Sequence, residues 1–487
     1  MTKTNSHKQP SLVVSFIPLV VLIILLALTI KIFGGDAIAG GSQLSLMAAS
    51  AVCSAIAIIG YRCKWQTLED AIVTNMRSAT PALLILLLIG AIAGTWMASG
   101  IIPTLIYYGL KIMHPAIFLP ATCIICAVIS LLTGSSWTTI ATIGVALMGI
   151  GRALGFDDGW IAGAIISGAY FGDKVSLMSD TTVLASSTSE VPLFSHIKYM
   201  LITTTPSLVI AIIVFTIAGL SATPASMVDT MQIEAALQHT YNISPWLLIV
   251  PVLTGVLISR RLPAIVTLFT SVLMAAIAMA VAQPDILMQI AGTDSLSFLT
   301  SFKAIVTATT TDTAVETGNT LLNDLVATGG MGGMMNTIWL IICAMCFGGV
   351  MWGSGMLVAI SQLFLRIAHR TVSIVTSTVC SGIFFNITTG DQYISIILTS
   401  NLFGGLYDKR GLERRLMSRS VEDSATVTSV LIPWNSCGMT QSTVLGVATL
   451  TYLPYCIFNI VSPLMSIFMA AIGYKIYKKK ETTDNEK

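Results

Sequence analysis

The chain has 487 residues, of which 54% are hydrophobic and only 10% are charged. A soluble domain carries about 25% charged residues, so this composition excludes a soluble protein and predicts one that crosses a membrane several times. The formal net charge of +2 is too small to indicate nucleic-acid binding, and the absence of a G-x-x-x-x-G-K-[ST] phosphate loop argues against an ATP-driven pump on this chain.

The first apolar runs predict membrane spans. Ser11 to Phe33 is too long for a signal peptide and lacks a small-residue cleavage pattern, so we expect a retained span. A second span is predicted over Gln43 to Tyr61. Arg62 to Thr80 mixes polar, apolar and basic residues and is typical of an interfacial helix on the cytoplasmic side. Pro81 to Ile101 predicts the next span.

A polar interruption follows in the apolar run that begins at Pro115. The run stops at Leu132, and apolar character resumes at Ile140. The interruption contains Thr133, Gly134, Ser135 and Ser136. Irregular backbone is tolerated at membrane depth only where it is buried in protein or lines a wet cavity. We therefore expect a helix that opens in mid-membrane, with a plain hairpin tip as the alternative.

The stretch from Gly172 to Thr182 places two acids, Asp173 and Asp180, between long apolar segments. Its hydroxyl side chains are Ser176, Ser179, Thr181 and Thr182. A charge at membrane depth costs about 2.5 to 3.5 kcal/mol, so it indicates a functional site. The alternatives are a loop outside the bilayer and a structural charge arrangement between Asp173 and Lys174. Gly159 to Phe171 is too short to cross alone, so we expect one discontinuous crossing from Gly159 to Glu190.

The middle of the chain predicts three further spans. Ile197 to Leu220 crosses fully, and the loop Ser221 to Ser244 lacks Lys and Arg, so it should face outward. Pro245 to Ser259 and Leu262 to Gln283 are joined by the basic turn Arg260-Arg261.

The second half begins with the acidic segment Pro284 to Gly333, which we expect outside, and the span Trp339 to Leu357. An apolar run from Val372 to Leu406 is then interrupted in its middle. The interruption consists of Thr388, Thr389, Gly390 and Asp391. We expect a re-entrant hairpin there, because it returns the basic stretch Asp408 to Arg419 to the cytoplasmic side.

A second polar core runs from Ser420 to Ser429 and closes at Pro433 to Ser436. Its candidate ligands are Glu422, Asp423, Ser424, Thr426, Thr428 and Asn435. Thr440 to Cys456 and Ile460 to Tyr477 predict the last spans, and Lys478-Lys479-Lys480 follows them.

The two halves repeat one pattern. Ser99-Gly100 recurs as Ser354-Gly355 at an offset of 255 residues, and Thr133-Gly134 recurs as Thr389-Gly390 at an offset of 256. The first repeat enters from a basic segment and the second from an acidic one, so the repeats should be inverted and both termini cytoplasmic. The predicted fold is an all-α polytopic membrane protein with two inverted-topology repeats, discontinuous helices and re-entrant hairpins. Its predicted parts are N-terminal spans (1–61), a first repeat (62–220), a linker with two spans (221–283), a second repeat (284–478) and a cytoplasmic tail (479–487).

The polar cores suit a small hard cation. Na⁺ takes oxygen ligands from carboxylates, hydroxyls and the free carbonyls of unwound helices. Burial raises the pKa of a carboxyl group and a bound cation lowers it, so one carboxylate can hold either a proton or Na⁺. We expect Na⁺ at Asp173, Asp180 and Asp423, no cofactor, and no covalent chemistry.

Inverted repeats place equivalent broken helices around one axis. We therefore expect Glu422 and Asp423 to face Asp173 and Asp180 across a shared site. Asp173 is the first candidate for the exchanging group because it follows directly on the short apolar half-helix. Asp180 is expected to act as a second ligand or a helix cap.

The motifs Gly172 to Thr182, Ser418 to Ser429 and Leu431 to Asn435 resemble those of the NhaC-type sodium/proton antiporters. The resemblance covers about Thr80 to Tyr474. It implies an antiporter of the bacterial inner membrane that meets lipid, Na⁺ and H⁺. The family that this resemblance implies also includes exchangers of organic acids such as malate and lactate, or of amino acids. Leu177 and Val430 depart from it, because we expect Pro at both places.

The leading hypothesis is Na⁺/H⁺ exchange by competition at the intramembrane carboxylates. The main alternative is a Na⁺- or H⁺-coupled exchanger of a small organic anion or an amino acid. A channel and an intramembrane enzyme are further alternatives, but an enzyme is disfavoured because neither H-E-x-x-H nor G-x-S-x-G occurs. The sequence leaves open whether the chain forms a homodimer.

Overall fold

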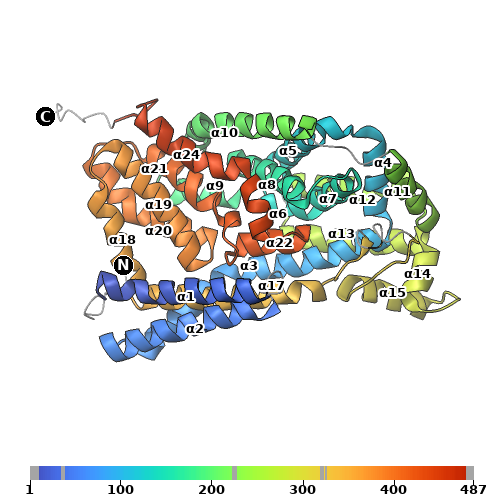
Figure 1. Ribbon diagram of the computed structural model, residues 1–487, viewed down its shortest axis with the longest axis horizontal. Coiled ribbons are helices and arrows are strands. Elements are labelled where there is room, and N and C mark those ends of the chain that lie inside the picture. The colour runs from blue at the N-terminus through green and yellow to red at the C-terminus, as the bar shows by residue number, and fades with distance from the viewer. Residues whose placement is uncertain are drawn as a thin grey trace.

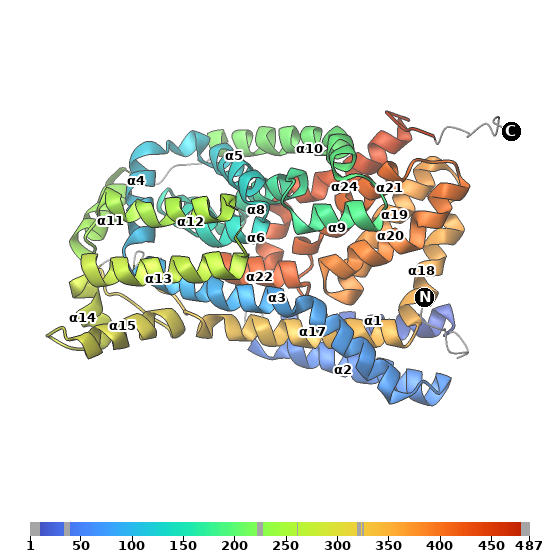
Figure 2. The same ribbon diagram turned by 180° about the vertical axis from the view of Figure 1, so that it is seen from behind.

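The computed structural model describes residues 10–33, 39–221, 227–260, 262–318, 323 and 326–478. In this part the chain is almost entirely helical. Eight of its helices are long and apolar enough to cross a membrane, or up to ten if each of two bent pairs is one span. The longest helices run along the long axis of the molecule (Figures 1 and 2). The predicted all-α polytopic fold is confirmed.

The chain begins with α1 (Leu12–Phe33), α2 (Gly41–Ala55) and α3 (Trp65–Ala98). The first two confirm the predicted spans. The predicted interfacial helix over Arg62 to Thr80 was wrong, because α3 is one 34-residue helix that passes through Pro81. The first half of α3 packs on α17 (Met335–Gly353), where Asn75 Nδ2 donates a hydrogen bond to the Met345 carbonyl at 2.7 Å. One face of this segment, which includes Leu68, Ala71 and Asn75, is therefore buried within the protein, and its place relative to the membrane stays a prediction.

Two series of helices follow the same order, as the sequence offset predicts. After α3 the chain turns at Gly100 (φ 78°) into the 12-residue α4 (Ile101–Ile112), and after α17 it turns at Gly355 (φ 76°) into the 12-residue α18 (Met356–Ile367). Positive φ is strained for residues with a Cβ, which explains glycine at both turns. The short helices α4 and α18 lie at opposite ends of the molecule (Figure 1).

The equivalent helices α3 and α17 pack antiparallel. Asn75 lies beside Met345, whereas Gly90, further along α3, lies beside Met334 at the start of α17. Antiparallel packing of equivalent elements is what inverted repeats require. The orientation of each repeat across the bilayer stays a prediction.

Both interrupted apolar runs form helical hairpins. The first consists of α5 (Pro115–Thr133), α6 (Ser136–Thr139), a π-helical turn and α7 (Val145–Ala153). Phe118 near its start stacks on Phe156 just beyond its end, with ring centroids 5.4 Å apart. The run therefore doubles back at the polar interruption, and the position of this break at mid-membrane depth stays a prediction.

The second interrupted run also forms a hairpin, and its re-entrant placement in the membrane stays a prediction. It consists of α19 (Thr371–Thr389) and α20 (Gln392–Lys409). Thr378 Oγ1 and Tyr407 Oη lie 3.1 Å apart across its two arms.

Two discontinuous helices carry the polar cores. In the first, α8 (Asp158–Val175) is separated from α9 (Asp180–Thr188) by four non-helical residues, as predicted. In the second, α21 (Arg414–Val421) continues into a π-helical turn (Glu422–Thr426), a 3₁₀ turn (Ser429–Leu431) and then α22 (Ser436–Leu445). Each core is closed by a long helix, α10 (Leu193–Ser221) in the first repeat and α24 (Ile457–Ala471) in the second.

Three further expectations need correction. The segment Ser221 to Ser244 contains α11 (Met227–Thr240) rather than only a loop. Its side chains Ile233, Leu237 and Tyr241 are buried at a spacing of four residues, and this short apolar stripe drives the helix. The acidic segment after Gln283 contains α14 (Pro284–Ala291) and α15 (Phe298–Thr310).

The run Thr440 to Cys456 is not one span. It is broken after α22 by Gly446 (φ 65°) and resumes as α23 (Thr449–Tyr452), which is bent by 56° from α24. Of the two predicted linker spans, α13 (Ala264–Ala282) is long enough to cross, whereas α12 (Ile249–Ser259) reaches that length only together with α11, from which it is bent by 89°. Arg261, Lys479, Lys480 and the predicted tail lie outside the described residues.

The first hairpin packs closely against α8 through glycine. A Cβ at Gly168 would lie 2.0 Å from the Cys123 carbonyl oxygen. Gly168→Ala should therefore destabilise the protein by about 1 to 3 kcal/mol through overpacking. Gly405→Ala in α20 is the matched control, because a Cβ there meets no atom within 4 Å. Thermal unfolding in detergent should show a lower Tm for Gly168→Ala only, and equal Tm values would contradict the close packing.

Candidate functional site

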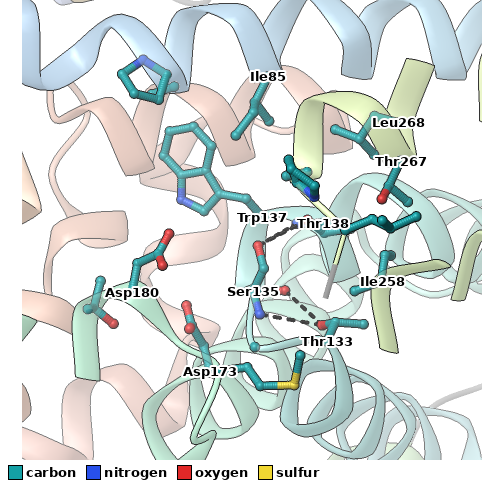
Figure 3. Close-up of a pocket in the computed structure, with 18 of the residues that line it drawn as sticks. Ile85, Thr133, Ser135, Trp137, Thr138, Asp173, Asp180, Ile258, Thr267 and Leu268 are labelled. Carbon is teal, nitrogen blue, oxygen red and sulfur yellow. Dashed lines mark hydrogen bonds between the residues drawn. The ribbon is translucent and has the colours of Figure 1, made fainter. Parts of the chain in front are cut away.

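A cavity of about 660 Å³ lies where the two repeats meet. Its walls come from α3, the tip of the first hairpin, the break between α8 and α9, the turn between α12 and α13, and the start of α20. Its polar lining residues are Ser78, Thr133, Ser135, Thr138, Asp173, Asp180, Thr181, Thr267, Gln392 and Tyr393. Figure 3 shows Asp173 and Asp180 close together on one side of this cavity.

The hairpin tip is a rigid wall of the cavity. Gly134 has φ 69°, and a Cβ there would lie 2.6 Å from Met178 Cβ, so both conformation and space call for glycine. Ser135 caps α6, because its hydroxyl accepts a hydrogen bond from the Thr138 amide at 3.2 Å. Thr133 Oγ1 accepts from the Ser135 amide at 3.4 Å. The predicted irregular backbone at this tip is therefore held by its own hydroxyls.

Asp173 connects α8 to the hairpin tip. Its Oδ2 accepts hydrogen bonds from the Ser136 amide at 3.2 Å and the Ser136 hydroxyl at 2.7 Å. The side chain is only 6% exposed. These donors belong to Ser136, the first residue of α6. The dipole of a helix also stabilises a carboxylate at its N-terminus. Asp173 is thus a buried acid with hydrogen-bond donors on one side and the cavity on the other.

Asp180, unlike Asp173, has no hydrogen-bond donors to its carboxylate among the described residues. It is the first residue of α9, is exposed to the cavity, and makes no hydrogen bond or ion pair with a residue that the structure describes. Tyr393, from the second repeat, lines the same cavity as Asp173 and Asp180. The site is therefore completed by a side chain from the second hairpin.

Most predicted hydroxyl ligands of the first core hold the backbone of the break. Ser176 Oγ donates to the Leu131 carbonyl at 2.9 Å, and Thr182 Oγ1 donates to the Lys174 carbonyl at 3.0 Å. Ser179 accepts from the Thr182 amide at 3.4 Å and so caps α9. Thr181 lines the cavity. These contacts fix the position of the two acids.

The second core does not line the cavity. Asp423 is fully buried and forms an ion pair with Lys174, whose neighbour in the chain is Asp173. Asp423 Oδ1 also accepts hydrogen bonds from Thr203 at 3.1 Å and Ser462 at 3.0 Å. An ammonium group thus occupies the place where Na⁺ was expected at Asp423. Neither Glu422 nor Asp423 lines the cavity with Asp173 and Asp180, and the shared site of the two cores stays a prediction.

The remaining polar residues of the second core divide into two kinds. Ser424 and Thr428 donate to carbonyls one turn back, and Asn435 caps α22 by accepting from the Cys437 amide at 3.0 Å. Glu422 and Thr426 are fully buried, and neither Glu422 oxygen accepts a hydrogen bond from a described residue. Ser424, Thr428 and Asn435 therefore stabilise the backbone of this core.

The tip of the second hairpin mirrors the first. Gly390 has φ 69°, and Asp391 caps α20 by accepting from the Ile394 amide at 3.0 Å. Asp391 Oδ2 also accepts from the Ser436 hydroxyl at 3.4 Å. Thr389 Oγ1 lies 3.2 Å from Ser395 Oγ. Asp391 is outside the cavity lining, whereas the next two residues of α20 are part of it.

Sequence reasoning missed several residues that the structure brings together. Lys174 and Arg419 are buried cations beside the second core, and Arg419 lies above the Tyr199 ring at 4.8 Å. A signal was present, because Lys174 directly follows Asp173 and Arg419 precedes Asp423 by one helical turn. For Trp137 and Tyr393 of the cavity, the signal was their equivalent position in the two repeats, at the offset of 256 residues.

The positions expected to carry Pro hold other residues. Leu177 lies in the break after α8 and lines the cavity, and Val430 is buried in the 3₁₀ turn of the second core. No group of three His, Cys, Asp or Glu side chains among the described residues could hold a metal ion together.

Comparison with known proteins identifies relatives along most of the chain. The sequence model of the Na⁺/H⁺ antiporter family matches residues 2–169 and 168–474. The Na⁺/H⁺ antiporter NhaC of Bacillus subtilis is 35% identical, over 87% of this chain and 91% of that protein. The malate-2H⁺/Na⁺-lactate antiporter of the same organism is 37% identical, over 91% of this chain and 92% of that protein. The arginine/ornithine antiporter ArcD of Halobacterium salinarum is 34% identical, over 98% and 95%.

Proposed function

Because this chain belongs to the Na⁺/H⁺ antiporter family, we propose that it exchanges Na⁺ for H⁺ at Asp173 and Asp180. The observation that carries the proposal is the pairing of two intramembrane carboxylates in one open cavity at the junction of the repeats. Secondary transporters bind their ions at such junctions, beside broken helices.

The two acids give a physical basis for competition. A proton neutralises a buried carboxylate, whereas Na⁺ neutralises it while using further oxygen ligands. Hydroxyl groups at Ser135, Thr138 and Thr181 line the same cavity. A site that opens to one side at a time and holds either H⁺ or Na⁺ performs exchange without covalent chemistry.

The lining of the cavity disfavours the organic-acid alternative. Among its described residues, two are acidic and none is Lys, Arg or His. An organic dianion would meet two carboxylates with no basic side chain to offset them. We therefore propose a cationic cargo. We also propose that the repeats are inverted in the bacterial inner membrane with both termini in the cytoplasm, as the basic clusters favour.

Proteoliposomes that contain the full chain and an internal pH dye test this function. Addition of Na⁺ outside should drive proton movement in the opposite direction, and an imposed pH gradient should drive uptake of ²²Na⁺. Equimolar K⁺ and protein-free liposomes are the controls. Proton movement that is independent of Na⁺, or Na⁺ uptake that ignores the pH gradient, would contradict exchange.

A further inference from the structure

Two helices that begin at the candidate cavity are tied together at their far ends by one ion pair between the repeats. We propose that Arg414 and Glu190 form an ionic clamp that positions Asp180 for cation binding and makes the affinity for Na⁺ depend on ionic strength. This inference rests on the proposed function in taking Asp180 as a cation ligand. It adds two positioning residues that lie outside the cavity lining.

The two helices are α9 of the first repeat and α20 of the second, which lie side by side (Figure 2). Asp180 is the first residue of α9 and Gln392 is the first residue of α20, and both line the cavity. Further along, Thr188 Oγ1 donates a hydrogen bond to Ser400 Oγ at 3.1 Å. A helix of nine residues is only about 14 Å long. The position of the last turn of α9 therefore constrains its first residue.

Arg414, the first residue of α21, joins the far ends of both helices. Its Nε and Nη2 donate to the two carboxylate oxygens of Asp408, in the last turn of α20, at 3.2 and 2.7 Å. Its Nη1 lies 2.8 Å from Glu190 Oε2, just beyond the end of α9. The bidentate contact fixes the guanidinium plane, so Nη1 is held in the direction of Glu190. The cation also lies near two helix C-termini, where the helix dipoles favour it.

Glu190 occupies a backbone position that usually holds glycine. Its φ is 56°. The Glu190 amide donates to the Ser187 carbonyl at 3.1 Å and the Val191 amide to the Ser186 carbonyl at 2.8 Å, which is the Schellman motif. Glycine is the common residue at the left-handed position of this motif, because a Cβ strains that conformation. An acid at this position, paired with an arginine of the other repeat, indicates a role for the side chain rather than for the backbone.

The clamp is open to solvent. The Glu190 side chain is 73% exposed and that of Arg414 is 23% exposed. Salt screens such pairs, because the Debye length falls from about 8 Å at 0.15 M to about 3 Å at 1 M ionic strength. A rise in ionic strength should therefore weaken the clamp, loosen the end of α9 and lower the affinity for Na⁺ at Asp180.

The variant Glu190→Gly separates positioning from folding, because it removes the carboxylate and relieves the strained backbone. In proteoliposomes of the full chain at low ionic strength, its apparent KM for ²²Na⁺ uptake should rise about two- to five-fold, the size expected of one exposed pair. Its maximal rate should be unchanged, and its Tm in detergent should be equal or higher. Added choline chloride should raise the KM of the unaltered protein toward that of the variant, and should leave the KM of the variant unchanged.

Two further variants serve as controls. Glu413→Gln removes a carboxylate from the same surface depression, where Glu413 pairs with its near neighbour Arg415 in the chain. It should keep both the KM and the salt response of the unaltered protein. Arg414→Met should raise the KM as Glu190→Gly does. The double variant of Glu190 and Arg414 should show no further rise, because both changes break the same pair.

The outcomes separate the clamp from the proposed function. An unchanged KM in Glu190→Gly, an equal rise in Glu413→Gln, or a rise in KM that comes with a lower Tm would overturn the clamp and leave Na⁺/H⁺ exchange standing. Absence of Na⁺-driven proton movement in the unaltered protein would overturn the proposed function itself, and the clamp with it.

Discussion

An Asp173→Asn protein should insert and fold, yet its Na⁺-dependent proton movement should fall to the level of protein-free liposomes. Asparagine keeps the shape of the side chain but removes the group that exchanges a proton for a cation. The contacts with Ser136 at 2.7 and 3.2 Å can be kept by the amide oxygen. A loss of transport at unchanged Tm would therefore report the missing charge rather than a damaged fold.

Two further variants sharpen this result. Asp173→Glu keeps the charge and moves it by one methylene group, so it should change the apparent KM for Na⁺ and retain some exchange. Asp70→Asn removes an exposed carboxylate of α3 that lies outside the cavity lining, and it should transport normally. If Asp173→Asn still drives Na⁺-dependent proton movement at the rate of the unaltered protein, Asp173 is not the exchanging group. Asp180 then becomes the first candidate for that role.

Asp173 ranks before Asp180 on structural grounds. Asp173 is almost completely buried and has donors on one side only, so neutralisation by either H⁺ or Na⁺ stabilises it strongly. Asp180 is exposed to the cavity, so its carboxylate is shielded from water less than that of Asp173. We expect Asp180→Asn to weaken apparent cation affinity more than it lowers the maximal rate.

The broken elements could be predicted because their causes are local. Glycine at Gly134 and Gly390 permits positive φ, and the hydroxyls and carboxylates beside them cap the helices that follow. Such residues inside an apolar run leave few alternatives at membrane depth. The repeat offset then placed both hairpins in equivalent positions. Helix α11 was missed because three apolar side chains in a polar segment form its only stripe.

The roles of the polar side chains could not be predicted in the same way. A hydroxyl at a helix break can coordinate a cation or satisfy a free carbonyl, and the sequence is the same in both cases. Ser176 and Thr182 bind carbonyls. The direction of Asp423 depends on the π-helical turn over Glu422–Thr426, which changes the register of the side chains along the helix. The sequence carries no clear signal for such a turn, so the partner Lys174 was not foreseen.

The ion pair between Lys174 and Asp423 leads to the second large expected effect. Both side chains are fully buried. Removing one partner of a buried pair costs about 3 to 5 kcal/mol because the other charge stays uncompensated. Asp423→Asn should therefore lower the free energy of unfolding by about this amount, seen as a large fall in Tm in detergent.

The two single variants should not be equal. Arg419 lies 3.9 Å from Asp423 Oδ2, and its guanidinium nitrogens have no hydrogen-bond partner among the described residues. After Lys174→Met, Asp423 keeps Arg419 as a counter-ion. After Asp423→Asn, Lys174 and Arg419 both lose the carboxylate that they share. We therefore expect Asp423→Asn to destabilise more than Lys174→Met, and the double variant to be more stable than Asp423→Asn alone, because one uncompensated charge is removed. Equal losses in the two single variants that simply add in the double variant would show that the pair is not coupled.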